Sequence, residues 1–187
     1  MDYRDNTVET LIQRAKTDPA AFARLYRLHY DGVFRYCARR LFDRHSAEDV
    51  TSTVFMKVMR NLDSFEGEKK DFRNWLFRIA TNAVNDHLRT AVRRADAVGN
   101  IEKEVRVKSA YVISDDFELQ EKKALLKQAV LSLKPKYQTV IALRFFENMK
   151  LIEIAECLDK KPATVRSWLS RALVKLRKNL SAAANNK

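Results

Sequence analysis

The sequence predicts an all-α protein of two small helical domains joined by a flexible linker, the second domain ending in a helix-turn-helix. Glycine and proline, which interrupt helices, number only three each among 187 residues. No stretch shows the alternating apolar and polar residues of a half-buried strand. Apolar residues instead recur at intervals of three and four along most of the chain, as one face of a helix requires.

The first domain, residues 1–92, contains four predicted helices. The second begins where Asp18 can act as N-cap and Pro19 can take the first helical position. Gly32 lies inside this helix and is expected to weaken or bend it. Residues 46–49, Ser-Ala-Glu-Asp, match a capping box with Asp in place of the usual Glu, and so predict the start of the third helix.

The third helix carries one broad apolar face, to which Met59 is assigned. A polar loop, residues 63–70, follows it, and Asp71 is predicted to cap the fourth helix. Trp75 lies in phase with the apolar stripe of that fourth helix. We interpret Trp75 as a core residue because buried aromatic rings dominate cores; the alternative is that it stacks on nucleic-acid bases.

Residues 93–118 lose the helical periodicity and end in an acidic cluster, which indicates a linker. The short apolar run at 110–113 within it is unexplained, and either docks on one domain or pairs with a partner. The second domain, residues 119–187, opens with a helix, and Pro135 begins the next one. Asn148 is the predicted C-terminal cap of that helix.

Residues 151–176 predict two short helices joined by a tight turn, with Pro162 in the first position of the second helix. The apolar stripe of this second helix comprises Val165, Leu169, Ala172, Leu173 and Leu176. Its opposite face carries small, hydroxyl and guanidinium side chains, which can enter a major groove and contact guanine or phosphate. The pattern is degenerate, so spacing alone fits an ordinary helical hairpin with a solvated basic face equally well.

The net charge of +12 is concentrated in the second domain. Residues 119–187 hold 15 Lys and Arg against 5 Asp and Glu, a net charge of +10. Such an excess indicates a nucleic-acid partner. A membrane-surface patch is the alternative, but the basic residues do not follow one amphipathic anchor.

The sequence offers no support for an enzyme. We find no nucleophile and base pair, no glycine-rich phosphate loop, and no ligand spacing among the three histidines, so we expect no metal and no cofactor. Cys37 and Cys157 lie in apolar helical patterns and are interpreted as small buried hydrophobes, which suggests a cytoplasmic protein. No apolar run is long enough for a membrane segment, and the N-terminus does not resemble a signal peptide.

Three stretches carry a family resemblance. They read AEDVTSTVFMKVMRNLDSF, FRNWLFRIATNAVNDHLR and LKPKYQTVIALRFFENMKLIEIAECLDKKPATVRSWLSRALVKLRK, in this order, with the linker before the third. The chain resembles an alternative sigma factor of bacterial RNA polymerase, of the extracytoplasmic-function type, over about residues 18–180. The resemblance implies a promoter-specificity subunit with core RNA polymerase and promoter DNA as partners, and in many members an anti-sigma factor as inhibitor. The first alternative is a stand-alone helix-turn-helix transcription regulator, and the second, less favoured one is a structural RNA-binding adaptor.

The resemblance assigns two roles to the first domain, which is similar to sigma region 2. The outward face of the third helix would dock on the polymerase largest subunit through Asp49, Ser52, Thr53 and Lys57. Family members carry Gln and Glu where this chain has Ser52 and Thr53, so the expected docking surface is less acidic. The loop at 63–71 and the helix after it would recognise and open the minus-ten promoter element. The residues assigned to that element are Phe65, Lys69, Arg78, Asn82, Asp86 and Arg89.

The resemblance further implies that the linker threads toward the polymerase active-site cleft. The second domain, similar to sigma region 4, would read the minus-thirty-five element through Thr164, Arg166, Ser167, Ser170, Arg171 and Lys175. The chain departs from the family at Asp159, where a turn Gly is usual, and at Lys161, where a capping Ser is common. Trp168 replaces a common Arg; it either packs on the domain, which we favour, or contacts the DNA backbone.

Overall fold

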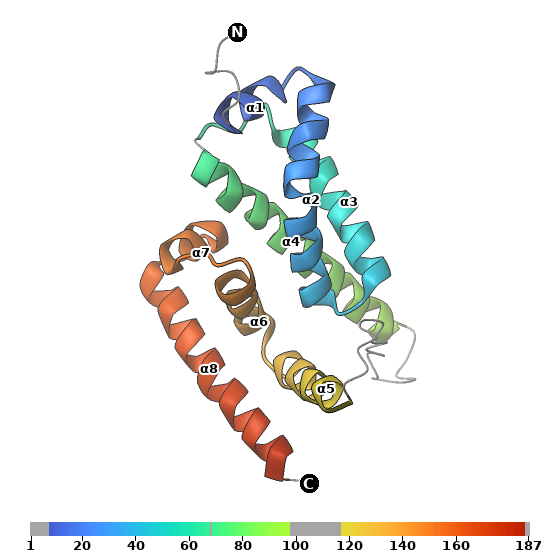
Figure 1. The fold of residues 1–187 in the computed structure, drawn as a ribbon, viewed down its shortest axis with the longest axis vertical. Helices are drawn as coiled ribbons and strands as arrows, with labels where there is room; N and C mark the ends of the chain where they lie inside the picture. The colour runs from blue at the N-terminus through green and yellow to red at the C-terminus, as the bar shows by residue number, and fades with distance from the viewer. Residues whose placement is uncertain (1–7, 68, 98–116, 186–187) are drawn as a thin grey trace. The chain divides into compact units, whose positions relative to one another are not determined.

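The computed structural model of the chain describes residues 8–67, 69–97 and 117–185, and every regular element in these ranges is a helix (Figure 1). The all-α prediction is therefore confirmed. The chain divides into two compact units, Met1–Lys108 and Ser109–Lys187. Most of the predicted linker, including the apolar run at 110–113, lies outside the described residues. Among the described helices, none combines the length and apolarity needed to cross a bilayer.

The first unit contains α1 (Val8–Arg14), α2 (Pro19–Leu41), α3 (Arg44–Asn61) and α4 (Lys69–Ala97). Helices α2, α3 and α4 pack against one another, and α1 packs mainly on α2 (Figure 1). Tyr36, in the C-terminal half of α2, is fully buried; its hydroxyl lies 2.8 Å from Thr81 Oγ1 on α4. Its ring meets Phe77 edge-on with centroids 5.5 Å apart. These contacts fix α2 against α4.

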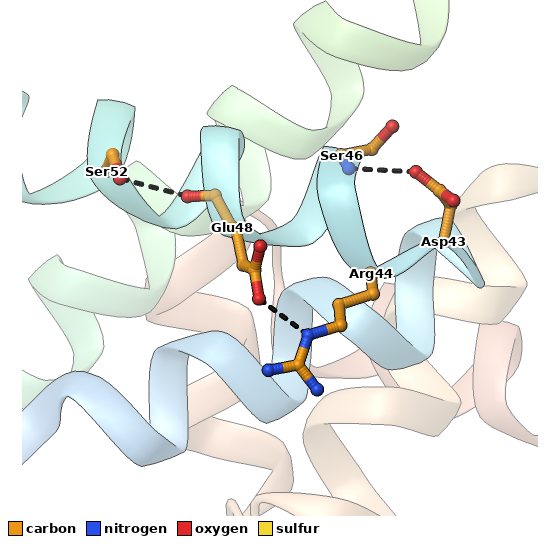
Figure 2. A network of polar contacts seen from close by, with 5 residues as sticks. All are labelled: Asp43, Arg44, Ser46, Glu48 and Ser52. Carbon is orange, nitrogen blue, oxygen red and sulfur yellow. Dashed lines mark hydrogen bonds and ion pairs between the residues drawn. The ribbon is translucent and has the colours of Figure 1, made fainter. Parts of the chain in front are cut away.

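The predicted start of α2 is confirmed, because Asp18 caps it and accepts a 2.8 Å hydrogen bond from the Ala20 N–H. Gly32 does not interrupt the helix, which runs unbroken to Leu41. The predicted start of α3 is wrong. The helix begins at Arg44, and Asp43 is its N-cap, accepting a 2.8 Å hydrogen bond from the Ser46 N–H (Figure 2).

Helix α4 also begins earlier than predicted, at Lys69, which places Asp71 in its first turn rather than at its cap. A carboxylate in that position still interacts favourably with the positive end of the helix dipole. The helix continues to Ala97, so its last five residues, 93–97, belong to the segment that was predicted as linker. Helical periodicity therefore weakens in the sequence before the helix itself ends.

The second unit contains α5 (Phe117–Leu131), α6 (Pro135–Ile141), the π-helical segment η2 (Ala142–Phe146), α7 (Leu151–Leu158) and α8 (Pro162–Asn185). Pro135 and Pro162 open α6 and α8 as predicted. Asn148 has a φ of 53° directly after the C-cap of η2, which confirms its predicted role at the end of this helix. A buried cluster, comprising Leu133, Tyr137, Ile141 and Ala172, ties α8 to α6.

Helices α7 and α8 form the predicted helix-turn-helix. Asp159 ends α7 in the left-handed conformation, with φ 52° and ψ 56°, and its N–H bonds back to Ala155 O and Glu156 O. Glycine adopts this conformation without strain, and Asp is among the residues that tolerate it best. The departure from the family pattern at this turn therefore preserves its geometry. Leu173 was wrongly assigned to the buried stripe of α8, since 41% of it is exposed.

Both cysteines are free thiols in the interior, as the sequence predicted. Cys37 is fully buried on α2, and Cys157 is 1% exposed on α7. Burial raises the pKa of the Cys37 thiol to about 11, because the thiolate would lose its hydration. Cys37 is therefore protonated near neutral pH and behaves as a small apolar side chain.

Candidate functional site

Helix α8 presents a basic face away from its buried stripe. Val165 and Ala172 are fully buried and hold the helix on its unit. Of the residues assigned to the upstream element, Arg166, Ser170, Arg171 and Lys175 are exposed, whereas Thr164 and Ser167 are half-buried. At 100° per residue these four positions span about half of the helix circumference, the half that faces away from Val165 and Ala172. The arrangement brings guanidinium, ammonium and hydroxyl groups together on a helix that can enter a major groove.

Trp168 belongs to the core side of α8. It is half-buried and packs against the cluster around Tyr137. The Lys136 ammonium lies 5.2 Å from the centre of its indole ring, at the distance of a cation–π contact. The preferred interpretation, that Trp168 packs on the domain, is confirmed. Where family members carry a cation on α8, this chain carries an aromatic ring with a cation from α6 above it.

The outward face of α3 carries the residues assigned to polymerase docking. Asp49, Ser52 and Thr53 are exposed, and Lys57 is half-buried. The Ser52 hydroxyl donates to Glu48 O at 3.0 Å (Figure 2), and the Thr53 hydroxyl donates to Asp49 O at 3.0 Å. Both hydroxyls are thus turned toward their own helix, so they present less polar character to a partner than Gln and Glu would.

Two methionines extend this face of α3, and sequence reasoning missed them. Met56 is 51% exposed and Met59 is 57% exposed, so the assignment of Met59 to the buried face is wrong. Met56 follows Ser52 by four residues and Thr53 by three, a spacing that could have placed it on the same face. Methionine is flexible and polarizable, which suits an adaptable apolar contact with a partner.

The α4 residues assigned to the minus-ten element form one exposed stripe: Arg78, Asn82, Asp86 and Arg89. Asp86 also pairs with two cations. Its carboxylate lies 3.8 Å from Lys57 Nζ on α3 and 3.5 Å from Arg89 on its own helix. The structure therefore joins a residue assigned to docking with two residues assigned to DNA.

Phe65 does not fit a direct contact with DNA in this conformation, because only 5% of it is exposed. Its ring packs 5.4 Å from Phe72 and 5.1 Å from Trp75, measured between centroids. Trp75 is half-buried in this cluster, which supports its interpretation as a core residue. Lys69 begins α4, and the position of its side chain lies outside the described part. The loop therefore packs on the aromatic cluster of Phe65, Phe72 and Trp75, and the Phe65 ring does not face solvent.

Comparison with known proteins identifies both units. Residues 25–94 match the family model of sigma-70 region 2, and residues 123–176 match that of sigma-70 region 4. The chain is 33% identical over 175 residues to the ECF RNA polymerase sigma factor SigW of Bacillus subtilis, covering 90% of this chain and 93% of that one. The chain belongs to the ECF sigma factors. It is also 30% identical over 159 residues to the RNA polymerase sigma factor YlaC of the same species, covering 84% of this chain and 90% of YlaC.

A solved structure shows the same fold. The sigma factor RpoE of Bartonella quintana, determined with the anti-sigma factor NepR, superposes with a TM-score of 0.67 at 23% identity. The match covers 86% of this chain and 96% of RpoE.

This ECF sigma factor is a promoter-specificity subunit of RNA polymerase. It binds the core enzyme and promoter DNA, and it is neither an enzyme nor a stand-alone regulator.

Proposed function

We propose that this sigma factor reads the minus-thirty-five element as duplex DNA through the exposed basic face of α8. The observation that carries this proposal is the placement of Arg166, Ser170, Arg171 and Lys175 on the outward half of a helix whose inward half holds the buried Val165 and Ala172. A groove-entering helix specifies sequence through base edges and gains affinity from phosphates. The net charge of +10 on residues 119–187 supplies the electrostatic part of that affinity.

The α4 stripe and the loop before it, we further propose, recognise and open the minus-ten element. Unpaired bases need surfaces to stack on or pockets to enter, and unstacking each base costs a few kcal/mol. Residues 1–92 hold 16 Lys and Arg against 13 Asp and Glu, a net charge of only +3. A domain with so little charge does not melt DNA by itself, so opening depends on the polymerase.

Docking on the core enzyme is assigned to the outward face of α3. Asp49 supplies a charge, while Met56 and Met59 supply exposed apolar surface a few residues further along the helix. The segment between α4 and α5, within the predicted linker 93–118, connects the two DNA-contacting domains and threads toward the active-site cleft in this proposal. Because the substrate of this assembly is chromosomal DNA, we place the protein in the cytoplasm. An anti-sigma factor is proposed as its inhibitor, as the family resemblance implies.

Run-off transcription with core RNA polymerase and selected genomic DNA tests the proposal as a whole, because a specific start site must appear only when the sigma factor is added. The variants Arg166→Ala and Lys178→Ala then separate base reading from phosphate contact. Arg166→Ala should cost about 1–3 kcal/mol on the cognate element and relax preference at one position. Lys178→Ala should weaken binding about equally on all duplexes and flatten the salt dependence.

Equal loss of affinity on cognate and scrambled duplexes would make Arg166 a phosphate contact and move base reading to Arg171 or the hydroxyl residues. If neither variant changes DNA binding, the assigned face of α8 is wrong.

A further inference from the structure

The loop between α3 and α4 is held by a residue that is distant in sequence, near the N-terminus of the same unit. Lys16 follows α1, and its ammonium donates a 2.9 Å hydrogen bond to the backbone carbonyl of Phe65. The same ammonium lies 3.5 Å from the backbone carbonyl of Asp63. These contacts join residues 49 and 47 positions apart in the chain. Lys16 thus connects α1 directly to the main chain of the loop.

Phe65 is fixed at its side chain as well as at its carbonyl. Its ring is buried against Phe72 and Trp75. The next residues of the loop, Glu66 and Gly67, are exposed. Gly67 passes so close to the Phe65 ring that a Cβ at this position would lie 3.0 Å from Phe65 Cζ. The exposed tip of the loop therefore follows directly after Phe65, whose carbonyl is hydrogen-bonded to Lys16 and whose ring is buried in the aromatic cluster.

Lys16 follows directly after a segment, α1 and Ala15, that is packed into the unit. Ile12 is 1% exposed and Ala15 is 7% exposed, so α1 is packed into the unit up to the residue before Lys16. The Lys16 N–H bonds to Gln13 O at 3.3 Å, and the Asp18 N–H bonds to Arg14 O at 2.9 Å. The backbone on both sides of Lys16 is therefore ordered, and its side chain reaches the loop from a fixed origin.

We propose that Lys16 is a positioning residue for promoter opening: it holds the loop so that the Glu66–Gly67 tip is preorganised for unpaired minus-ten bases. This inference rests on the proposed role of the loop and α4 in minus-ten recognition. A loop that is already ordered does not lose conformational entropy when the bases bind, so binding is tighter. Removing the hydrogen bonds should weaken minus-ten opening by about two- to tenfold, the range for one lost hydrogen bond.

The test uses the full chain and three variants. Lys16→Met keeps the aliphatic stem and removes the donors, Lys16→Arg restores donors, and Arg27→Met removes a cation from an exposed position on α2 of the same unit. Amide hydrogen exchange of residues 63–67 is measured in the free protein. Opening is measured by 2-aminopurine fluorescence in the minus-ten element with reconstituted holoenzyme, alongside core binding. Lys16→Met should speed exchange and reduce opening by two- to tenfold at unchanged core affinity, while Lys16→Arg largely restores both and Arg27→Met changes neither.

Asn82→Ala separates failure of this inference from failure of the proposed function. Asn82 lies on the exposed α4 stripe, and the hydrogen bonds of Lys16 to the carbonyls of Asp63 and Phe65 do not involve it. If Asn82→Ala reduces opening but Lys16→Met does not, the minus-ten surface stands and the positioning role of Lys16 is overturned. Unchanged exchange in Lys16→Met would also overturn it. If neither Asn82→Ala nor Lys16→Met changes opening, the proposed minus-ten function itself fails.

Discussion

Asp43→Ala should destabilise the first unit by about 1–2 kcal/mol. The Asp43 carboxylate accepts the Ser46 N–H at 2.8 Å, and its backbone, at φ −137° and ψ 129°, is extended, which Ala also adopts. The substitution therefore removes only the side-chain cap. Loss of an N-cap typically costs about 1 kcal/mol, and loss of a negative charge at the positive end of the helix adds about 0.3–1 kcal/mol.

The assay exploits the two tryptophans, one in each unit. In a Trp168→Phe background, Trp75 fluorescence reports thermal unfolding of the first unit alone. A loss of 1–2 kcal/mol should lower the transition by roughly 4–16 °C for a domain of this size. Ser46→Ala is the matched control. It keeps the backbone N–H that donates to the Asp43 carboxylate, so it should destabilise the unit less than Asp43→Ala does. A larger loss from Ser46→Ala than from Asp43→Ala would show that Ser46 caps α3 and would refute the assignment of Asp43.

The pH dependence gives a second check. Hydrogen bonds from Ser46, first from its backbone N–H, lower the pKa of Asp43 from its ordinary value of 3.8. Because the folded pKa lies below the unfolded one, the stabilisation from this charge is full above the unfolded pKa and is lost as the pH falls through the folded value. The stability difference between the wild type and Asp43→Asn, which keeps an acceptor, should therefore shrink below about pH 4.

Five further substitutions test the glycines, the ring of Trp168 and an exposed methionine. Gly32→Ala should stabilise the first unit by about 0.5–1 kcal/mol, because a Cβ there meets no atom within 4 Å. Gly67→Ala should destabilise the same unit, because a Cβ there would lie 3.0 Å from the side chains of Asp71 and Phe65. Thermal unfolding measures both changes in stability. Trp168→Ala should lower the stability of the second unit by about 2 kcal/mol, which is less than the loss of a fully buried tryptophan, because Trp168 is only half-buried. Lys136→Ala should lower it by at most about 1 kcal/mol. A larger effect of Lys136→Ala would contradict the cation–π assignment. Met59→Glu should weaken binding to core polymerase without changing the circular dichroism, since 57% of Met59 is exposed; unchanged affinity would remove Met59 from the docking face.

The sequence predicted helix type and order well, because apolar periodicity reports burial directly. It predicted helix starts only where the local chemistry offers one solution, as at Asp18 followed by Pro19. Between Asp43 and Asp49 three residues can cap a helix, and tertiary packing decides among them. The sequence also assigned too many residues to the buried faces of helices. Met59 and Leu173 are hydrophobic and lie beside a buried stripe, but both are exposed. Their side chains are apolar whether or not a neighbour covers them, so residue type alone does not reveal which edge is open.

The site was less predictable than the fold because its geometry depends on contacts between distant segments. Phe65 was assigned to DNA because the family resemblance gives its loop a role in recognising the minus-ten element. In the structure that loop folds over its own aromatic residue, and the cluster with Phe72 and Trp75 involves side chains whose direction the loop sequence does not specify. The hydrogen bond from Lys16 to the Phe65 carbonyl spans 49 positions and follows no local pattern.

The first unit holds its two proposed surfaces with contacts of different strength. The ion pairs of Asp86 with Lys57 and Arg89 involve side chains that are 43–68% exposed, and such pairs contribute about 0–1 kcal/mol. DNA or polymerase can therefore take either cation from Asp86 at little cost. The loop is different, because displacing it would expose the Phe65 ring and break the hydrogen bond to Lys16 together, at a cost of several kcal/mol. Charged groups on α3 and α4 can thus rearrange when partners bind while the base of the loop keeps its position.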